Sequence, residues 1–334
     1  MLNKLLFIFF IMTTILSADW NEYKSLFIAD DGRVIDRVNS DITHSESIGY
    51  ALYLAIQNSD TQSFNKIHNW YQNNLKKNEF GLFGWKWGKD QDGSWHTLDL
   101  NNASDGDIWI AYDNLLMFEK TKEAKYKQEA ISLMQNIKKY LIMEQNGMLY
   151  LLPGKQGFVY DDTIEINLSY YIFFIFDRFE KYDNDTIWSR LKQDGIKLIY
   201  QSRFTPLQLN ADWISIDKNT NKILPSKNNS FGYDALRIPF NILNSDIPDK
   251  GKLLEPYKNY VNSMKTASSI FGVTDLKNGN ISLYNYSYGH LSIYNMIDKH
   301  FNNMTSFSTQ IRQLKGEKRN DYYSYSIYLL TTSH

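Results

Sequence analysis

The sequence predicts an all-α fold in a single domain. Apolar residues recur at helical spacing in about eleven segments, whereas the signals for strands are few and short. No Pro-rich, Gly/Ser-rich or low-complexity linker interrupts residues 19–334, and the whole chain contains only 6 Pro. We therefore expect one domain over 19–334, built from helices that pair in sequence, with long functional loops at one end.

The composition is that of an ordinary globular protein. Of the 334 residues, 43% are hydrophobic and 22% are charged, so apolar burial can offset the entropy of the chain. The net charge of −1 gives no electrostatic reason to expect a nucleic acid or an anionic membrane as partner. Aromatic residues make up 15% of the chain. Most of these rings fill the core, but surplus rings often line grooves that bind sugars or apolar ligands.

The reactive residue types narrow the chemistry further. The chain has no Cys, which excludes disulfides, thiolate zinc sites and cysteine nucleophiles. Its 6 His residues show no metal-ligand spacing such as H-E-x-x-H, so a metal would need carboxylate ligands. We expect neither a metal nor another cofactor.

The first element, residues 1–18, is predicted to be a secretory signal peptide. Lys4 precedes an apolar run of about twelve residues, which is too short for a membrane span, and Ser17 and Ala18 supply small residues for cleavage. The residues upstream of the cut fit an A-x-A site imperfectly, so an uncleaved anchor is the alternative. We expect a periplasmic or secreted protein without a membrane span in the mature chain.

The helical elements follow in order along the rest of the chain. Ile48, Ala51, Leu52 and Ala55 show the i, i+3, i+4, i+7 pattern of one helix face, and Gly147 supplies a stop for a later helix. The expected helices lie near 48–56, 63–74, 107–119, 126–141, 165–180, 185–199, 233–244, 254–268, 287–297, 303–313 and 321–331.

Extended structure is expected in three short segments only. Residues 81–89 place Phe83, Trp85 and Trp87 on one face of an extended segment. Residues 148–157 and 278–287 resemble hairpin or loop pieces between helices.

Acidic residues stand at the starts of two predicted helices. Ser45 is expected to cap the first helix, which puts Glu46 in its first turn. Ser104 is expected to cap another, with Asp105 in the first turn and Asp107 at the third position, where a carboxylate can return a hydrogen bond to the cap. Capping thus accounts for Asp107. It explains Glu46 and Asp105 less well, because a serine that can cap the helix already precedes each of them.

A further acid, Asp234, lies at or just before the start of a third predicted helix. Pro239 leaves the position of that start open, because it removes one backbone donor. Any one acid at a helix start is explained by the helix dipole, which favours it by about 0.3–1 kcal/mol. A set of such acids with rings nearby also suits glycosidic cleavage, which needs one protonated carboxyl group and one ionised carboxylate.

A series of short motifs stands along the chain: "DGRVID" at 31–36, "SESIGY" at 45–50, "WKWGK" at 85–89, "NNASDGDIW" at 101–109, "LLPGKQGF" at 151–158, "NLSYY" at 167–171, "ADW" at 211–213 and "YDALR" at 233–237. The run "ASDGD" at 103–107, followed by Ile110 and Ala111, resembles the signature of the glycoside hydrolases of family 8, and the other motifs stand in that family's order. Among its members the chain most resembles the periplasmic endoglucanases that accompany bacterial cellulose synthases.

The resemblance implies an (α/α)6 barrel of six inner and six outer helices, with long loops that form a substrate groove. It implies that Glu46 is the general acid and that Asp234 is the general base, which activates water in an inverting reaction. Asp105 would hold the distorted sugar at the point of cleavage.

The remaining substrate-binding residues are also implied by motif matches. Tyr170 and Arg237 would contact the attacking water, the base or the sugar. The aromatic candidates for contact with substrate are Trp85, Trp87, Trp109 and Tyr233, although Trp109 could as easily belong to the core.

The chain departs from the family pattern at several positions. Ser47 replaces a glycine after Glu46, which could crowd the approach of substrate to the acid. Asp113 and Asn114 stand where a small and then an aliphatic residue are expected, which puts the packing of that helix in doubt. Leu168 stands where proline is usual.

The expected function is hydrolysis of a β-1,4-linked polysaccharide or oligosaccharide, as a secreted endo-β-1,4-glucanase with the cellulose synthase machinery as a candidate partner. Inversion requires the carboxyl groups of Glu46 and Asp234 to lie roughly 6.5–9.5 Å apart. One alternative is a family-8 hydrolase that acts on xylan, mixed-linkage glucan or chitosan, although Asp234 in its motif points away from the chitosanase branch. The other is a catalytically weak, glycan-binding accessory protein of cellulose synthesis.

Overall fold

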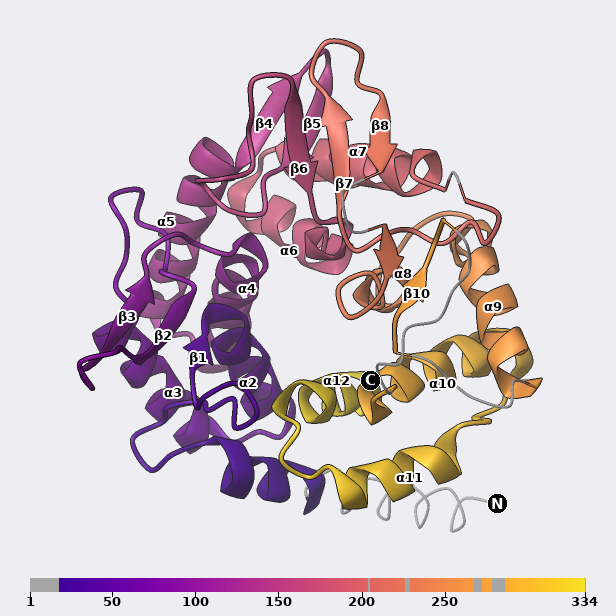
Figure 1. Cartoon of the computed structure of the whole chain (residues 1–334). Coiled ribbons are helices and arrows are strands. Elements are labelled where there is room, and N and C mark those ends of the chain that lie inside the picture. Colours follow the sequence, from indigo (N-terminus) through magenta and orange to yellow (C-terminus); the bar gives the residue numbers. More distant parts are fainter. Residues whose placement is uncertain (1–17, 204, 226–228, 267–271, 278–285, 334) are drawn as a thin grey trace.

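The helices of the computed structural model form two concentric rings (Figure 1). The structure describes residues 18–203, 205–225, 229–266, 272–277 and 286–333. The predicted signal peptide falls outside this part of the chain, apart from its last residue, and so does most of the segment predicted as a loop over 278–287.

Six helices of the described chain form the inner ring. Each contacts the next, and the last returns to the first, which closes the ring. They are α2 (Ser45–Gln57), α4 (Ser104–Thr121), α6 (Phe173–Asp183), α8 (Arg237–Leu243), α10 (Tyr288–Asn302) and α12 (Tyr322–Thr332).

The outer ring covers the inner one. A helix over residues 18–27 packs on α12 through Tyr23, whose ring contacts Tyr322 and Tyr325. Each other outer helix packs on the inner helix that precedes it in sequence. These are α3 (Thr61–Asn74), α5 (Ala124–Leu141), α7 (Ile187–Gln201), α9 (Lys250–Thr266) and α11 (Ser308–Glu317). The predicted all-α fold, an (α/α)6 barrel, is confirmed.

The pattern of buried residues distinguishes helices of the inner ring from those of the outer ring. In α4 the residues from Ser104 to Leu115 are all buried, so the helix has no solvent face over that length. In α5 the buried residues recur at helical spacing on one face only, which is typical of a helix with one side in water.

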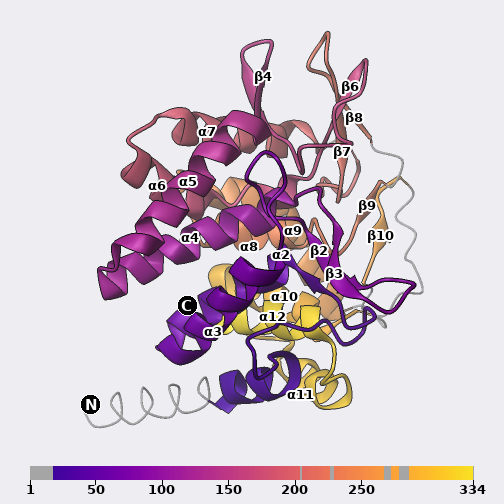
Figure 2. The ribbon, with the colours of Figure 1, turned by 90° about the vertical axis from the view of Figure 1, so that its left-hand side faces the viewer.

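Short antiparallel strands gather on one side of the barrel (Figure 2). One sheet has the order β1-β2-β3 and another β6-β7-β8, and β4-β5 and β9-β10 are two-stranded. Their bounds are β1 (Thr43–His44), β2 (Lys86–Lys89), β3 (Trp95–Asp99), β4 (Ile142–Gln145), β5 (Met148–Leu151), β6 (Thr163–Ile166), β7 (Ile214–Asp217), β8 (Ile223–Pro225), β9 (Ser230–Phe231) and β10 (Thr274–Asp275). Because β1 leads into α2, β3 into α4 and β9 into α8, this side carries the N-terminal ends of inner helices.

The helix expected over 165–180 is wrong in its first part. Strand β6 occupies 163–166, a 3-10 turn η1 (Leu168–Tyr170) follows, and α6 begins only at Phe173. Ile164 and Ile166 are both buried against the sheet, a strand-like alternation that overlaps the helical spacing of the apolar residues downstream.

The helix expected over 233–244 is shorter than predicted. Backbone hydrogen bonds from Leu236 to Gly232 and from Arg237 to Asp234 form a turn first, and α8 then begins at Arg237. Pro239 fits inside the first turn of α8, where its missing N–H costs no helical hydrogen bond.

Neither predicted serine cap is correct. The N-cap of α2 is His44, which forms a reciprocal capping box with Ser47, and the N-cap of α4 is Ala103, which has no side-chain cap. Ser45 and Ser104 are instead the first residues of their helices. Within the described residues, no helix is both long enough and apolar enough to cross a membrane.

Candidate active site

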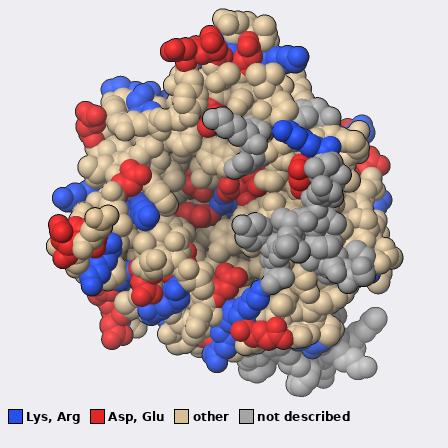
Figure 3. All heavy atoms as spheres, in the orientation of Figure 1, with Lys and Arg blue, Asp and Glu red and all other residues tan. Residues whose placement is uncertain are grey.

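The candidate site lies in a hollow at the centre of the strand-bearing face, where acidic side chains gather (Figure 3). Arg237, at the start of α8, contacts three carboxyl groups there. One terminal nitrogen donates to Glu46 of α2 and to Asp105 of α4, the latter at 3.3 Å. The other donates to Oδ1 of Asp234 at 2.5 Å. The barrel thus unites three acids that the sequence separates widely.

Neutral groups complete the surroundings of Arg237. Its terminal nitrogens also donate to the hydroxyl groups of Tyr50 at 3.2 Å and of Ser169 at 3.1 Å. The residue is only 6% exposed. A buried cation in the middle of the acids offsets part of the cost of burying them together.

The carboxyl groups nevertheless outnumber the cation. If all three were ionised, their charges would exceed that of Arg237 by two. Burial, with the charge of Glu46 next in size, raises the pKa of Asp105 to about 7. Partial burial and the charge of Glu46 raise the pKa of Asp234 against the opposing effect of Arg237. Asp105 therefore holds its proton to much higher pH than a free aspartic acid does.

Ser47, which stands in place of a glycine after Glu46, belongs to the capping box of α2. The Ser47 hydroxyl donates to the carbonyl oxygen of His44 at 2.6 Å, and the backbone N–H of Ser47 donates to Nδ1 of His44. Ser47 is completely buried, so its side chain does not crowd the approach to Glu46. The departure from the family pattern serves the capping box that begins α2.

Asp107 does not cap its own helix, contrary to the prediction. Its Oδ1 accepts a hydrogen bond from the backbone N–H of Phe83 at 3.0 Å, and its Oδ2 accepts one from Nδ2 of Asn102 at 2.9 Å. Asp107 therefore holds two loop segments next to the site, and it is fully buried.

Two of the predicted aromatic residues border the acids. Trp85 and Tyr170 line a cavity of about 200 Å³ together with Glu46 and Asp105. The indole Nε1 of Trp85 donates to Asp99 at 2.7 Å, which holds the ring in place. These two rings are available to a sugar at the acids.

Trp87 and Trp109, by contrast, lie in the core. Trp109 is 2% exposed and packs edge-on against Tyr50 and Tyr53. Trp87 is 9% exposed and stacks on Trp95. The expected single face of Trp85 and Trp87 is interrupted because the strand register shifts between residues 86 and 87.

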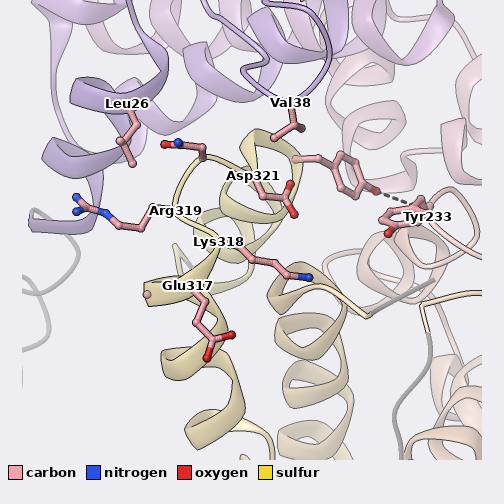
Figure 4. A pocket seen from close by; sticks show the side chains of 10 residues that line it. Leu26, Val38, Tyr233, Glu317, Lys318, Arg319 and Asp321 are labelled. Carbon is pink, nitrogen blue, oxygen red and sulfur yellow. Dashed lines mark hydrogen bonds between the residues drawn. The ribbon is translucent and has the colours of Figure 1, made fainter. Parts of the chain in front are cut away.

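Tyr233 is the most exposed of the predicted aromatic residues, at 41%. It lines an open groove of about 970 Å³ with Tyr323, Val38 and residues 316–321, at and after the end of α11 (Figure 4). The hydroxyl group of Tyr323 donates to the carbonyl oxygen of Tyr233 at 2.7 Å. Tyr233 directly precedes Asp234 in the chain, and the charges of Glu46 and Asp234 act on the hydroxyl group of Tyr323.

Several residues of the site were not assigned a role from the sequence. Trp213 donates from Nε1 to Oδ2 of Asp234 at 3.2 Å, and Asp212 accepts hydrogen bonds from the turn that carries Asp234. These two residues and Ser169 stand in the motifs "ADW" and "NLSYY", whereas Tyr50 could have been found from its position one helical turn after Glu46.

Asp113 and Asn114, the two residues of α4 that depart from the family pattern, differ in how their side chains are paired. Asp113 is fully buried, and neither of its carboxyl oxygens has a hydrogen-bond partner. Asn114 donates to the hydroxyl group of Tyr71 and to the carbonyl oxygen of Ile110.

The described residues contain no group of three His, Cys, Asp or Glu side chains placed to hold a metal ion.

Comparisons with known proteins agree with this architecture. The family described as "Glycosyl hydrolases family 8" matches residues 1–334. An endoglucanase of Cellulomonas uda is 31% identical over 246 residues, which cover 73% of this chain and 67% of that protein. A probable endoglucanase of Novacetimonas hansenii is 28% identical over 276 residues, 82% of this chain and 80% of that protein.

Solved structures show the same fold. An endoglucanase from Komagataeibacter sucrofermentans superposes with a TM-score of 0.82 at 28% identity, over 95% of this chain and 96% of that one. The endo-β-1,4-glucanase CMCax from Acetobacter xylinum gives a TM-score of 0.83 at 26% identity, over 95% and 97%. The fold, the three carboxyl groups around Arg237 and the sequence agree. The chain belongs to family 8 of the glycosyl hydrolases.

Proposed function

We propose that the chain hydrolyses cellulose-type β-1,4-glucan as an inverting endo-β-1,4-glucanase, with Glu46 as general acid and Asp234 as general base. The observation that carries the proposal is the contact of both carboxyl groups with different nitrogens of one guanidinium group. Arg237 holds the proposed acid and base at one guanidinium group, and the inverting course is what the motif resemblance implies for this pair.

The mechanism follows from these positions. Glu46 donates its proton to the leaving glycosidic oxygen while that bond to the anomeric carbon breaks. Asp234 removes a proton from water, whose oxygen attacks the anomeric carbon from the opposite face. Asp105 accepts a hydrogen bond from a hydroxyl group of the sugar at the cleavage point. Each cycle ends with the proton on Asp234, so proton exchange with solvent must restore the acid.

The open groove supports endo-acting cleavage. The groove of about 970 Å³ has room for sugar units beyond the cleavage point, and Tyr233 and Tyr323 supply rings along it. An enclosed pocket would instead accept the end of a chain. The relatives named as endoglucanases support the same assignment.

A panel of polysaccharides tests the function most directly. Carboxymethylcellulose, xylan, mixed-linkage glucan and chitosan are offered to the full chain, and NMR follows the anomer first released. We expect fastest release of reducing ends from the cellulose derivative, with α-anomers appearing first. Faster cleavage of another polymer would transfer the proposal to that substrate, and β-anomers would refute inversion.

Two substitutions separate catalysis from binding. Glu46→Gln and Asp234→Asn each keep the shape of the side chain, and we expect both to abolish product release while leaving binding of cello-oligosaccharides measurable by calorimetry. Binding without turnover in the unmodified protein would favour a glycan-binding accessory role instead. Activity retained by either variant would remove that residue from its proposed role.

We also propose that residues 1–18 are a signal peptide that directs a single domain over 19–334 to the periplasm or the medium. The short apolar run after Lys4 supports this. Fractionation of expressing cells, with sequencing of the mature N-terminus, tests both points, and a cytoplasmic protein with an intact N-terminus would refute them. The cellulose synthase machinery is the partner to test by co-purification from the membrane fraction.

A further inference from the structure

The turn that carries Asp234 is tethered by a residue twenty-two positions earlier in the chain. Oδ1 of Asp212 accepts hydrogen bonds from the backbone N–H groups of Gly232 at 3.0 Å and of Ala235 at 2.8 Å. Its Oδ2 accepts one from the hydroxyl group of Ser230 at 2.9 Å, and its own backbone N–H donates to the carbonyl oxygen of Ser230 at 2.7 Å. Asp212 thus holds the chain on both sides of Asp234.

The next residue holds the carboxyl group itself. Nε1 of Trp213 donates to Oδ2 of Asp234 at 3.2 Å, while Arg237 donates to Oδ1 at 2.5 Å. The indole is stacked on Phe158, with ring centroids 5.8 Å apart and planes 7° apart, and it meets Tyr170 edge-on. A stacked ring cannot turn easily, so each oxygen of Asp234 is held by a donor whose own position is constrained.

Close packing at Gly232 shows that the tether and the turn fit each other tightly. A Cβ atom on Gly232 would lie 2.7 Å from Oδ2 of Asp212, which is closer than real Cβ contacts allow. Any side chain there would therefore displace the Asp212 carboxylate or the turn.

We propose that Asp212 and Trp213 are positioning residues for the general base: Asp212 holds the backbone of the 230–235 turn, and Trp213 aims the Asp234 carboxylate. This inference rests on the role of Asp234 proposed above. Neither residue takes or gives a proton in the reaction, and they act through Asp234.

The two residues influence the base in opposite directions. Burial, together with the charge of Asp234, raises the pKa of Asp212 to about 6, and the two carboxyl groups repel each other when both are ionised. The charge of Asp212 accordingly favours the protonated form of Asp234, whereas the hydrogen bond from Trp213 favours the ionised form and lowers the pKa of Asp234. The other titratable groups that act on or face Asp234 come from several elements: Glu46, Asp105, Tyr170, Arg237 and Tyr323.

Four variants test the proposal on the full chain with carboxymethylcellulose as substrate. Asp212→Ala removes the tether, and we expect kcat to fall by about ten- to a hundredfold, because a small displacement of a catalytic group has an effect of that size. Asp212→Asn keeps an oxygen for the two backbone N–H groups and should recover most of that loss. Trp213→Phe keeps a stacked ring but removes the donor. Asp217→Ala is the matched control, since Asp217 accepts similar turn hydrogen bonds from Asn219 and Thr220 at the other end of β7.

The pH profile of kcat/KM distinguishes positioning of the base from a purely structural role. Its acidic limb reports ionisation of the base. We expect this limb to move to lower pH in Asp212→Asn and to higher pH in Trp213→Phe, and to stay in place in Asp217→Ala. Unmoved limbs in both of the first two variants would overturn the proposal, even if their thermal stability fell.

Asp234→Asn separates this inference from the function on which it rests. If that variant is inactive and Asp212→Ala retains full kcat, only the positioning role is refuted. If Asp234→Asn is fully active, the proposed base is itself wrong. Should Asp212→Ala fail to fold, the opposite shifts expected for Asp212→Asn and Trp213→Phe still decide the question.

Discussion

Asp107 offers a quantitative measure of what burial does to an acid in this barrel. The residue is fully buried, and among the described residues no lysine or arginine forms an ion pair with it. Burial raises its pKa from 3.8 to about 7, against the lowering effect of the hydrogen bonds from Phe83 and Asn102. The folded state therefore binds a proton at Asp107 more tightly than the unfolded state does.

The sign and size of the effect on stability follow by linkage. The contribution of Asp107 is fully present below pH 3.8 and is lost as the pH rises through about 7. At about 1.4 kcal/mol per pH unit, the interval from 3.8 to about 7 corresponds to about 4 kcal/mol. About 3 kcal/mol of this falls between pH 5 and pH 8.

The variant Asp107→Asn removes this titration. An asparagine can still accept the hydrogen bond from Phe83, but its amide group opposes that of Asn102, so we expect it to be less stable than the natural protein at pH 5 by about 1 kcal/mol. At pH 8 it should be more stable, because it carries no buried charge.

Urea unfolding of both proteins at pH 5 and pH 8 gives the four free energies of unfolding. We expect the natural protein to lose about 3 kcal/mol more than the variant between these pH values. Asp92→Asn, on the exposed turn between β2 and β3, is the control and should lose as much as the natural protein. A difference between Asp107→Asn and the natural protein that is the same at both pH values would refute the reasoning.

Other substitutions test separate features. Trp85→Ala should raise KM by about tenfold with little change in kcat, because its ring lines the cavity at the acids, whereas Trp87→Ala should lower thermal stability without raising KM, because its ring is buried; steady-state kinetics and calorimetry decide. Asp113→Asn should stabilise the protein at pH 8 by about 1–3 kcal/mol in urea unfolding and have less effect at pH 5, because burial raises the pKa of this unpartnered acid; equal effects at both pH values would contradict this. Gly49→Ala should destabilise the barrel by about 1–3 kcal/mol, because its Cβ would lie 2.4 Å from that of Trp109; an unchanged melting temperature would count against the close contact of α2 with α4.

The all-α fold was largely predictable because its outer helices are amphipathic over long stretches, whereas the barrel arrangement was implied by the resemblance. Helical spacing located the outer helices, such as α5, where one face is apolar and the other is in water. It failed over 165–180 because a strand of four residues is decided by its partner, and β6 pairs with β7 some fifty residues later. Short strands of this kind leave little local pattern to read.

The site was predictable only in part, for a related reason. Glu46, Asp105 and Asp234 could be identified because motifs mark them, but Asp107 was assigned to capping because an acid at a helix start looks the same whatever it binds. Its partner Phe83 lies twenty-four residues earlier. Only the packing of the loop onto α4 shows that the carboxylate holds the loop rather than its own helix.

The single central cation, Arg237, compensates the negative charge of the site only in part. The first turns of α2 and α4 present Glu46 and Asp105 to the same space as the turn before α8, and three ionised carboxylates there would repel one another strongly. Arg237 offsets this repulsion, yet one positive charge cannot neutralise three negative ones, so the raised pKa of Asp105 keeps a proton in the site. A second cation in the same place would lower the pKa of Asp105 again and favour loss of that proton. Burial and the excess of negative charge together therefore keep Asp105 protonated to higher pH than a free aspartic acid.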